Sequence, residues 1–249
     1  MPPPAAIPAS SRPAHRVRRV VTDRLGGVSG SPYDAFNLGA HVGDDPAAVE
    51  ANRVRLAALT GVGPADVVWM EQIHGRTVRR IDGAQAEPVP GCDALVTTLR
   101  GLLLAVLAAD CVPVLLADPY AGVVGAAHAG RPGVRLDIVA ATVAEMVVAG
   151  ADPGRIDALL GPAICGRCYE VPPEMQRDVE AHAPGSASVT SAGTTGLDLR
   201  AGVRGQLGAV GVTSVAADPR CTAEDTTLYS HRREGVTGRQ SGLVWLERR

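Results

Sequence analysis

Lysine is absent from this chain of 249 residues: all 24 residues counted as Lys+Arg are arginine. This absence excludes Schiff-base and pyridoxal phosphate chemistry, which need a lysine amine, and the phosphate-binding loop that ends in Lys. Any anion that the protein binds must therefore be held by Arg, His, backbone N–H groups or a metal ion.

Aromatic residues are also scarce, at 3% of the chain, and the formal net charge is −2. A nucleic-acid-binding surface usually combines a basic stripe with aromatic side chains, and the sequence has neither. We therefore expect no nucleic-acid partner. The motifs GxGxxG, GxSxG and HExxH, the EF-hand loop and the zinc signature of base deaminases are missing too, so none of these sites is predicted.

No apolar run is long enough to cross a membrane. The most apolar window, Gly101 to Ala117, falls short of the roughly 20 residues that a membrane-spanning helix needs. It also contains Asp110, and an Asp at the centre of a bilayer costs about 2.5–3.5 kcal/mol. The window predicts two buried strands with a polar residue between them, and no membrane partner is expected.

The N-terminus has no long apolar segment after its arginines, so a signal peptide is not expected. Five cysteines are an odd number for a set of disulfides. A reduced, cytoplasmic protein fits both observations best.

The chain is 46% hydrophobic and 20% charged, an ordinary globular composition. Residues 1–14, rich in Pro, Ala and Ser, are predicted to be a flexible tail, and residues 15–249 a single domain. Short apolar runs bounded by turn residues predict strands at 67–70, 94–97, 102–109, 112–117, 123–127, 156–160 and 243–246.

Three segments have helical patterns. The first runs from Pro46 to Thr60, with Asp45 as N-cap and Gly61 as the residue that ends it. The others cover residues 135–149 and 198–210. Strands interspersed with helices predict the α/β or α+β class.

Three metal-ligand residue types follow or end predicted strands. They are His74, Cys111 and His128. Two imidazoles and a thiolate match a catalytic zinc site, which has three protein ligands and one open position. The spacing alone favours ordinary roles, as hydrogen-bonded histidines and a buried cysteine. A third interpretation makes Cys111 a nucleophile with His128 as its base.

Other polar motifs carry weaker predictions. Cys165 and Cys168 form a CxxC without a second CxxC, which is too sparse to predict a structural zinc site. Basic segments at 230–233 and 237–239 suit either a phosphate or ribose contact or a solvated turn.

The order of the motifs identifies a family. In chain order they are Ser31-Pro32-Tyr33-Asp34, Asn37-Leu38-Gly39, His41-Val42-Gly43-Asp44-Asp45, Asn52-Arg53, Gln72-Ile73-His74-Gly75, Cys92-Asp93-Ala94-Leu95, Ala109-Asp110-Cys111-Val112-Pro113, His128-Ala129-Gly130, Gly161-Pro162-Ala163-Ile164, Cys168-Tyr169-Glu170-Val171, Cys221-Thr222, Tyr229-Ser230-His231-Arg232-Arg233 and Thr237-Gly238-Arg239-Gln240. From about Val20 to the end, the chain resembles the YfiH-like family, also called the laccase-domain or multicopper polyphenol oxidase family.

The resemblance implies a layered α/β/β/α sandwich and a metal, usually zinc, held by His74, Cys111 and His128. It also implies a purine nucleoside enzyme with phosphate as co-substrate. The family's reactions are phosphorolysis of adenosine, inosine, guanosine and methylthioadenosine, and deamination of adenosine. We expect a monomer or homodimer.

Within this interpretation the metal ligands are also catalytic, and Asp110 acts beside them as a proton donor or as a support for a ligand. The candidate substrate contacts are Asn37, Arg53, Gln72, Arg232 and Arg233. One motif departs from the family's His-Ala-Gly-Trp-Arg-Gly: here Arg131 and Pro132 follow Gly130. The departure bears on phosphate or substrate binding more than on the metal.

Three alternatives stay open. A copper-dependent polyphenol oxidase is the family's older description. The chain has six His, however, and a multicopper centre needs about ten or more ligands, mostly His, so copper would have to occupy the single mononuclear site. The second alternative is a metal-independent Cys–His amide hydrolase, and the third is a binding module with structural zinc.

Overall fold

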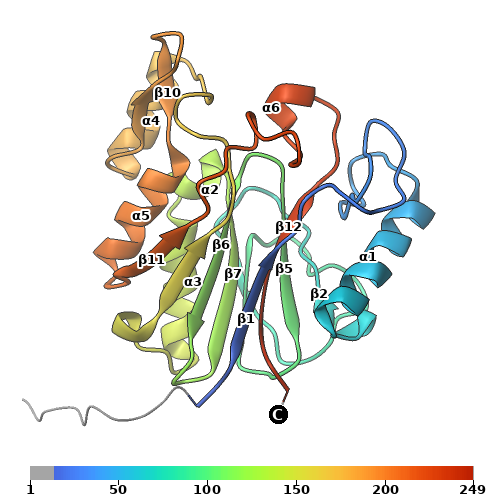
Figure 1. Cartoon of the computed structure of the whole chain (residues 1–249). Helices are drawn as coiled ribbons and strands as arrows, with labels where there is room; N and C mark the ends of the chain where they lie inside the picture. Colours follow the sequence, from blue (N-terminus) through green and yellow to red (C-terminus); the bar gives the residue numbers. More distant parts are fainter. Residues whose placement is uncertain (1–13, 249) are drawn as a thin grey trace, which may run out of the picture.

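The computed structural model describes residues 14–248, and two β-sheets packed face to face form their centre (Figure 1). In spatial order, the six-stranded sheet consists of β11 (Ser214–Ala217), β8 (Asp157–Leu160), β6 (Val112–Asp118), β7 (Val123–Ala129), β4 (Ala94–Thr97) and β3 (Val78–Arg80). The four-stranded sheet consists of β1 (Val17–Val21), β12 (Gln240–Leu246), β5 (Leu103–Ala108) and β2 (Val67–Val68). A separate hairpin pairs β9 (Ala187–Val189) with β10 (Thr195–Leu197).

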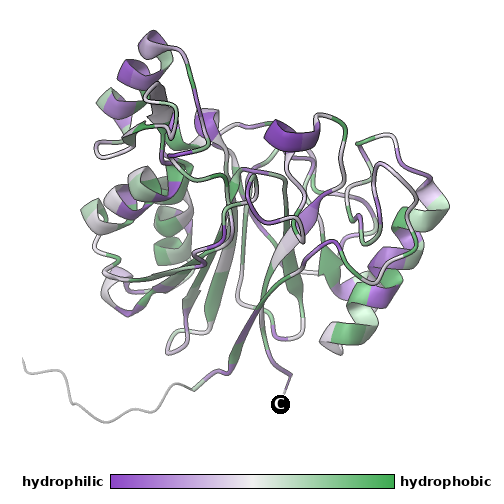
Figure 2. Cartoon of the chain, turned by 45° about the horizontal axis from the view of Figure 1, so that its top comes forward, coloured by the Kyte–Doolittle hydropathy of each residue, from purple (hydrophilic) through white to green (hydrophobic). Residues whose placement is uncertain are grey.

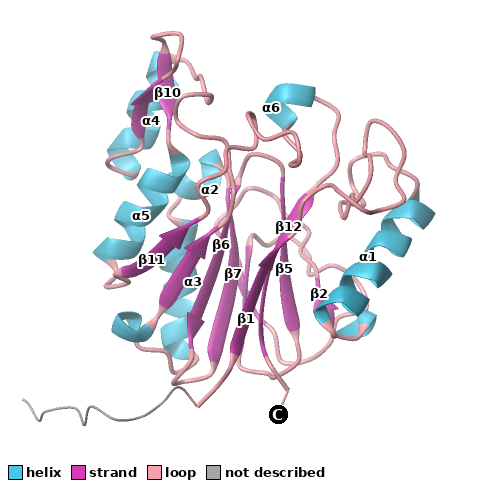
Figure 3. Cartoon of the chain, viewed as in Figure 1, coloured by secondary structure: helices cyan, strands magenta, loops and turns pink. Residues whose placement is uncertain are grey.

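Helices cover the outer faces of both sheets (Figure 3). On the six-stranded sheet they include α2 (Arg131–Arg135), α3 (Ile138–Val148) and α5 (Leu199–Ala209), while α4 (Pro173–His182) packs against α2 and the β9–β10 hairpin. The four-stranded sheet is covered by α1 (Pro46–Thr60). The remaining helices are α6 (His231–Glu234) and two 3-10 turns, η1 (Pro64–Asp66) and η2 (Pro153–Arg155). This arrangement confirms the predicted α/β/β/α sandwich.

The central strands are buried on both faces, which explains why their sequences are continuous apolar runs. On β6, Val114 packs under the helices, whereas the next residue, Leu115, packs between the two sheets. On β5, Leu104 faces the space between the sheets and Leu103 faces α1. Figure 2 shows these strands as largely hydrophobic ribbons, whereas the helices are a mixture of hydrophilic and hydrophobic residues.

Capping residues set two of the three predicted helices. Asp45 accepts a hydrogen bond from the N–H of Ala47, and Gly61 ends α1 with φ of +68°. Asp198 caps α5 in the same way, so the first and third helix predictions are confirmed. The helix predicted at 135–149 is wrong at its start, because Asp137 has φ of +59° and caps a new helix, α3.

The predicted tail at 1–14 lies outside the described residues, apart from Ala14. Within the described range, 14–248, no helix has both the length and the apolar character needed to span a bilayer.

The topology brings three chain segments to one end of the sandwich. The chain passes from β5 in one sheet to β6 in the other through residues 109–111. His128 lies near the end of β7 and is paired with Pro113 at the start of β6. The loop between β2 and β3 carries His74 to the same place.

Candidate active site

The structure brings His74, Cys111 and His128 together. Their potential ligand atoms all lie within 4.8 Å of one another. The Nε2 atom of His74 is 3.8 Å from the Cys111 sulfur, and the two imidazole rings meet edge to face with centroids 4.7 Å apart. His128 is buried, Cys111 is half-buried and His74 is exposed.

Asp93, at the start of β4, orients two of these residues. Its carboxylate is fully buried and accepts a hydrogen bond from Nδ1 of His128 at 2.9 Å, so Nε2 is the nitrogen of that ring that could bind a metal. It also accepts backbone N–H groups from Ile73, His74 and Gly75 at 3.2, 3.0 and 2.6 Å. Asp93 therefore fixes both the ring of His128 and the loop that carries His74.

The backbone is strained on both sides of the cluster. His74 has φ of +58° and Asp110, next to Cys111, has φ of +91°. Such values are uncommon for residues other than glycine and gather at functional sites. Gly130 is required for space, because a Cβ there would lie 2.8 Å from His74 Cδ2 and 2.9 Å from the Cys111 sulfur.

The electrostatics favour a thiolate beside a protonated imidazole. Burial would raise the pKa of Cys111, but the charge and hydrogen bond of His128 outweigh burial and lower that pKa. Burial would lower the pKa of His128, but Cys111 and Asp93 outweigh it and raise that pKa. Burial likewise opposes ionisation of Asp93, yet its hydrogen bonds from His128 and Gly75 lower the pKa of its carboxyl.

These residues fit a zinc ion. Two imidazole nitrogens and one thiolate are the donor types that zinc prefers, with Zn–N near 2.0–2.1 Å and Zn–S near 2.3 Å. Tetrahedral geometry then places N and S about 3.6 Å apart, close to the 3.8 Å between His74 and Cys111. Within residues 14–248 this ligand group has three members, which leaves one coordination position for a substrate or water.

A cavity of about 450 Å³ lies over the cluster. Its volume is within the range of small-molecule sites. The apolar part of its wall includes Leu107, Ile164, Tyr169 and Leu199. The cavity therefore combines a potential metal-ligand group with a wall suited to a partly apolar substrate.

Three arginines and two histidines form another part of the wall. Arg131, Arg232 and Arg239 line the cavity together with His41 and His231. None of the three arginines forms an ion pair with an acidic residue in the part of the chain that the structure describes. Cationic groups without acidic partners make the cavity suited to an anion such as phosphate.

Burial lowers the pKa values of two of these residues, Arg239 and His41. Arg239 donates to the backbone carbonyls of Thr237 and Gly238 at 2.8 and 2.9 Å, and burial lowers its pKa. Burial, followed by the charges of Arg239 and Arg53, lowers the pKa of His41, which favours its neutral form.

Asp110 and Gln72, predicted from the sequence, line the cavity, but their polar atoms are already engaged. Asp110 accepts hydrogen bonds from Thr222 Oγ1 at 2.6 Å and from the N–H of Arg232 at 2.7 Å. The Gln72 amide exchanges two 2.8 Å hydrogen bonds with the backbone of Leu107. Both side chains act here as braces for the cavity wall.

Asn37, Arg53 and Arg233 are not among the residues that line this cavity. Asn37 is fully buried and donates to Gly39 and Asp44. Arg53 donates to the carbonyl of Leu38 and its guanidinium lies 4.3 Å from the ring centre of Trp69. The Arg233 guanidinium donates to three backbone carbonyls, those of Thr222, Asp225 and Leu228.

Sequence reasoning assigned no role to Asp93, His41 or Tyr169, whereas Arg239 lies in the basic segment 237–239, for which a phosphate or ribose contact was one of two interpretations. Each of them stands in one of the quoted motifs, so the motifs contained the residues but not their roles. Arg131, noted as a departure from the family pattern, lines the cavity, and so does Pro132.

Comparisons with known proteins show which proteins this chain resembles. A protein of Corynebacterium glutamicum named as a purine nucleoside phosphorylase is 60% identical over 232 residues, which are 92% of this chain and 94% of the relative. A Streptomyces griseus protein with the same kind of name is 58% identical over 91% of this chain and 93% of its own.

Solved structures show the same fold. YlmD from Geobacillus stearothermophilus has a TM-score of 0.87 and 35% identity, over 93% of this chain and 92% of that one. The hypothetical protein YfiH of Bacillus licheniformis also has a TM-score of 0.87, with 31% identity over 93% of each chain. A family model described as multi-copper polyphenol oxidoreductase laccase matches residues 18–247, and the chain therefore belongs to this laccase-like, YfiH-type family.

Proposed function

We propose that this protein is a zinc-dependent purine nucleoside phosphorylase whose metal is held by His74, Cys111 and His128. One observation carries the proposal: three arginines without acidic partners line the same cavity as the metal-ligand group. The names of the relatives support the proposal, because they are called purine nucleoside phosphorylases.

A zinc ion at this site would supply a Lewis acid that stabilises negative charge in the cavity. The protein's own residues would do the rest. Asp93 keeps the proton on Nδ1 of His128, and the guanidinium groups of Arg131 and Arg239 neutralise the phosphate. The apolar wall next to Tyr169 packs against the base and excludes water from it.

The reaction balances without any further reagent. A phosphate oxygen forms a bond to C1′ of the ribose while the bond from C1′ to N9 breaks and its electrons go to the purine. The proton that hydrogen phosphate loses is the one that the purine gains. Holding the two reactants in line is a task that the cationic and apolar walls perform together.

Deamination of adenosine is the second candidate reaction. The observation that favours it is the open fourth position of the three-ligand group. A water molecule in place of phosphate would attack C6 of adenine and displace ammonia, giving inosine.

The test is product analysis with adenosine, inosine, guanosine and methylthioadenosine, each with and without phosphate. We expect free base and ribose 1-phosphate only with phosphate, and inosine from adenosine without it. Cys111→Ala should abolish both reactions, whereas Cys92→Ala, which changes a buried cysteine outside the His74, Cys111 and His128 group, should retain them.

Two results would overturn the proposal. Nucleoside phosphorolysis that survives metal chelation would contradict the zinc dependence. Amide hydrolysis that survives chelation, with no nucleoside turnover, would favour the Cys–His amide hydrolase. Oxidation of phenols that requires copper, with no nucleoside turnover, would favour the polyphenol oxidase.

A further inference from the structure

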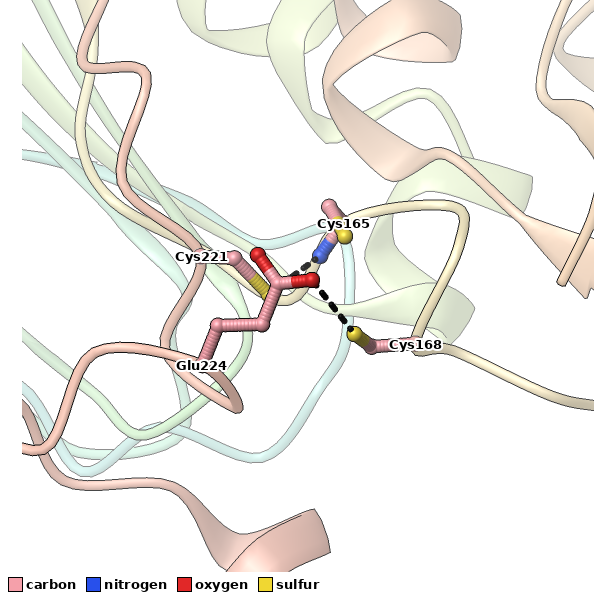
Figure 4. Close-up of side chains that lie close together, drawn as sticks. All are labelled: Cys165, Cys168, Cys221 and Glu224. Carbon is pink, nitrogen blue, oxygen red and sulfur yellow. Dashed lines mark hydrogen bonds between the residues drawn. The ribbon is translucent and has the colours of Figure 1, made fainter. Parts of the chain in front are cut away.

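A second cluster of potential metal ligands lies apart from the first (Figure 4). The sulfurs of Cys165, Cys168 and Cys221 and a carboxylate oxygen of Glu224 all lie within 4.8 Å of one another. The CxxC pair thus has partners after all, and they are 56 residues further along the chain.

The backbone on one side of the cluster is a tight turn. The N–H groups of Cys168 and Tyr169 both donate to the carbonyl of Cys165 at 3.0 Å, which folds the CxxC segment back on itself. This turn points both of its sulfurs toward the same space (Figure 4).

The other side is a second turn, attached to the first by backbone pairing. Ala163 and Cys221 form a parallel β-bridge, and the N–H of Thr222 donates to Ala163 at 3.2 Å. The N–H of Glu224 then donates to the carbonyl of Cys221 at 3.1 Å, so the carboxylate turns back over the sulfurs. The positions of the three sulfurs and the carboxylate are therefore fixed by backbone hydrogen bonds of the two turns.

Existing contacts show how the donors are oriented. The N–H of Cys165 donates to the Cys221 sulfur at 3.3 Å, and the Cys168 thiol donates to Glu224 at 3.4 Å. Arg167 lies 3.5 Å from Glu224 and supplies a positive charge next to the anionic ligands. A metal ion would replace the thiol protons in this arrangement.

We propose that Cys165, Cys168, Cys221 and Glu224 bind a second zinc ion, with a structural role. Tetrahedral zinc with Zn–S near 2.3 Å places its sulfurs about 3.8 Å apart, so the cluster needs only a small contraction. Three thiolates and one carboxylate fill all four positions, which is typical of a structural site. Thiolates exclude Mg²⁺ and Ca²⁺, which prefer oxygen donors.

The ion would join two segments that build the active-site wall. Ile164 and Tyr169, on the first segment, line the cavity. Thr222, on the second segment, donates to Asp110 at 2.6 Å. This proposal is independent of which reaction the cavity catalyses.

The test is a metal titration of reduced protein from which metal has been removed by a chelator. Co²⁺ is the probe, because thiolate ligands give it intense charge-transfer absorption, and Zn²⁺ then displaces it. We expect the wild type to bind two equivalents. Cys168→Ser should bind one and lose most of the thiolate absorption, whereas Cys111→Ala should bind one and keep most of it.

Two controls make the result decisive. Cys92→Ala changes a cysteine outside both clusters and should still bind two equivalents. The active-site equivalent that Cys168→Ser retains shows that this variant has folded. A wild type that binds one equivalent, unchanged in Cys168→Ser, would overturn the proposal, and so would a disulfide between Cys165 and Cys168 that re-forms in place of metal binding.

Discussion

Asp93→Asn tests whether a single buried carboxylate organises the metal centre. In the wild type, the two oxygens of Asp93 accept four hydrogen bonds, from the His128 ring and from the N–H groups of Ile73, His74 and Gly75. Asparagine has the same shape but offers one acceptor oxygen and one NH₂ group. Two of the four donors would then face another donor.

The magnitude follows from that count. Each buried donor without an acceptor costs about 1–3 kcal/mol, so the free energy of unfolding should fall by about 2–6 kcal/mol. Removing the carboxylate partner of a metal-binding histidine typically lowers metal affinity about 10–100-fold. We expect both effects in Asp93→Asn, because the same carboxylate orients His128 and the loop of His74.

The matched control is Asp118→Asn. Asp118 is also fully buried and accepts three backbone N–H groups, from Tyr120, Ala121 and Asp152, but it is not among the residues that line the cavity. It should lose stability without losing active-site metal affinity. Stability is measured by denaturant unfolding, and metal affinity by competition with a chelator. Cys111→Ala, which lacks an active-site ligand, gives the metal signal that comes from outside this site. Equal metal affinities for the two Asn variants would refute the orienting role of Asp93.

Three other changes separate the roles of neighbouring residues. Gly130→Ala adds a Cβ within 3 Å of atoms of two proposed metal ligands, His74 and Cys111, and should abolish metal binding at the active site. Metal analysis measures this, and full metal occupancy of that site in the variant would contradict the expectation. Arg131→Gln should raise the KM for phosphate about 10–150-fold, which corresponds to the loss of one hydrogen bond to a charged group. Arg135→Gln is the control, because Arg135 forms its ion pair outside the cavity, and this change should leave the KM for phosphate unchanged. Backbone N–H groups after α4 lower the pKa of Glu180, so its carboxylate stabilises the fold above pH ~4.3 and this contribution is lost as the pH falls through the lower folded-state pKa. Glu180→Gln should therefore lower Tm more at pH 7 than at pH 3. An equal difference at both pH values would be inconsistent with this.

The strands were predictable because burial on both faces leaves a strong mark on the sequence. The runs that form β5, β6 and β7 stand out as apolar segments between turn residues. By contrast, α4 has a single buried residue, Val179, and its apolar stripe, which adds only Met175 and Ala183, is too narrow to predict a helix. The start of α3 was misplaced because one residue, Asp137, interrupts an otherwise continuous helical pattern.

The proposed metal ligands could be singled out from the sequence only through the resemblance, and the carboxylate that orients them could not. His74, Cys111 and His128 have no diagnostic spacing, but they occupy recognisable motifs. The role of Asp93 depends on four donors from two different chain segments that meet only in the folded protein. A local sequence pattern does not show that distant segments come together, so a motif can contain a residue without indicating its role.

The two clusters of potential metal ligands differ in ligand number and surroundings, and these differences favour different roles. The first has three ligands and opens into a cavity with cationic walls, so its fourth position is available for chemistry. The second has four ligands and lies where the 163–169 and 221–224 segments are paired. These segments also carry Tyr169 and Thr222, which form or brace the cavity wall. An ion in the second cluster would therefore act on the reaction only by keeping the wall in place. Its loss should weaken substrate binding while leaving the ligand geometry of the first cluster intact.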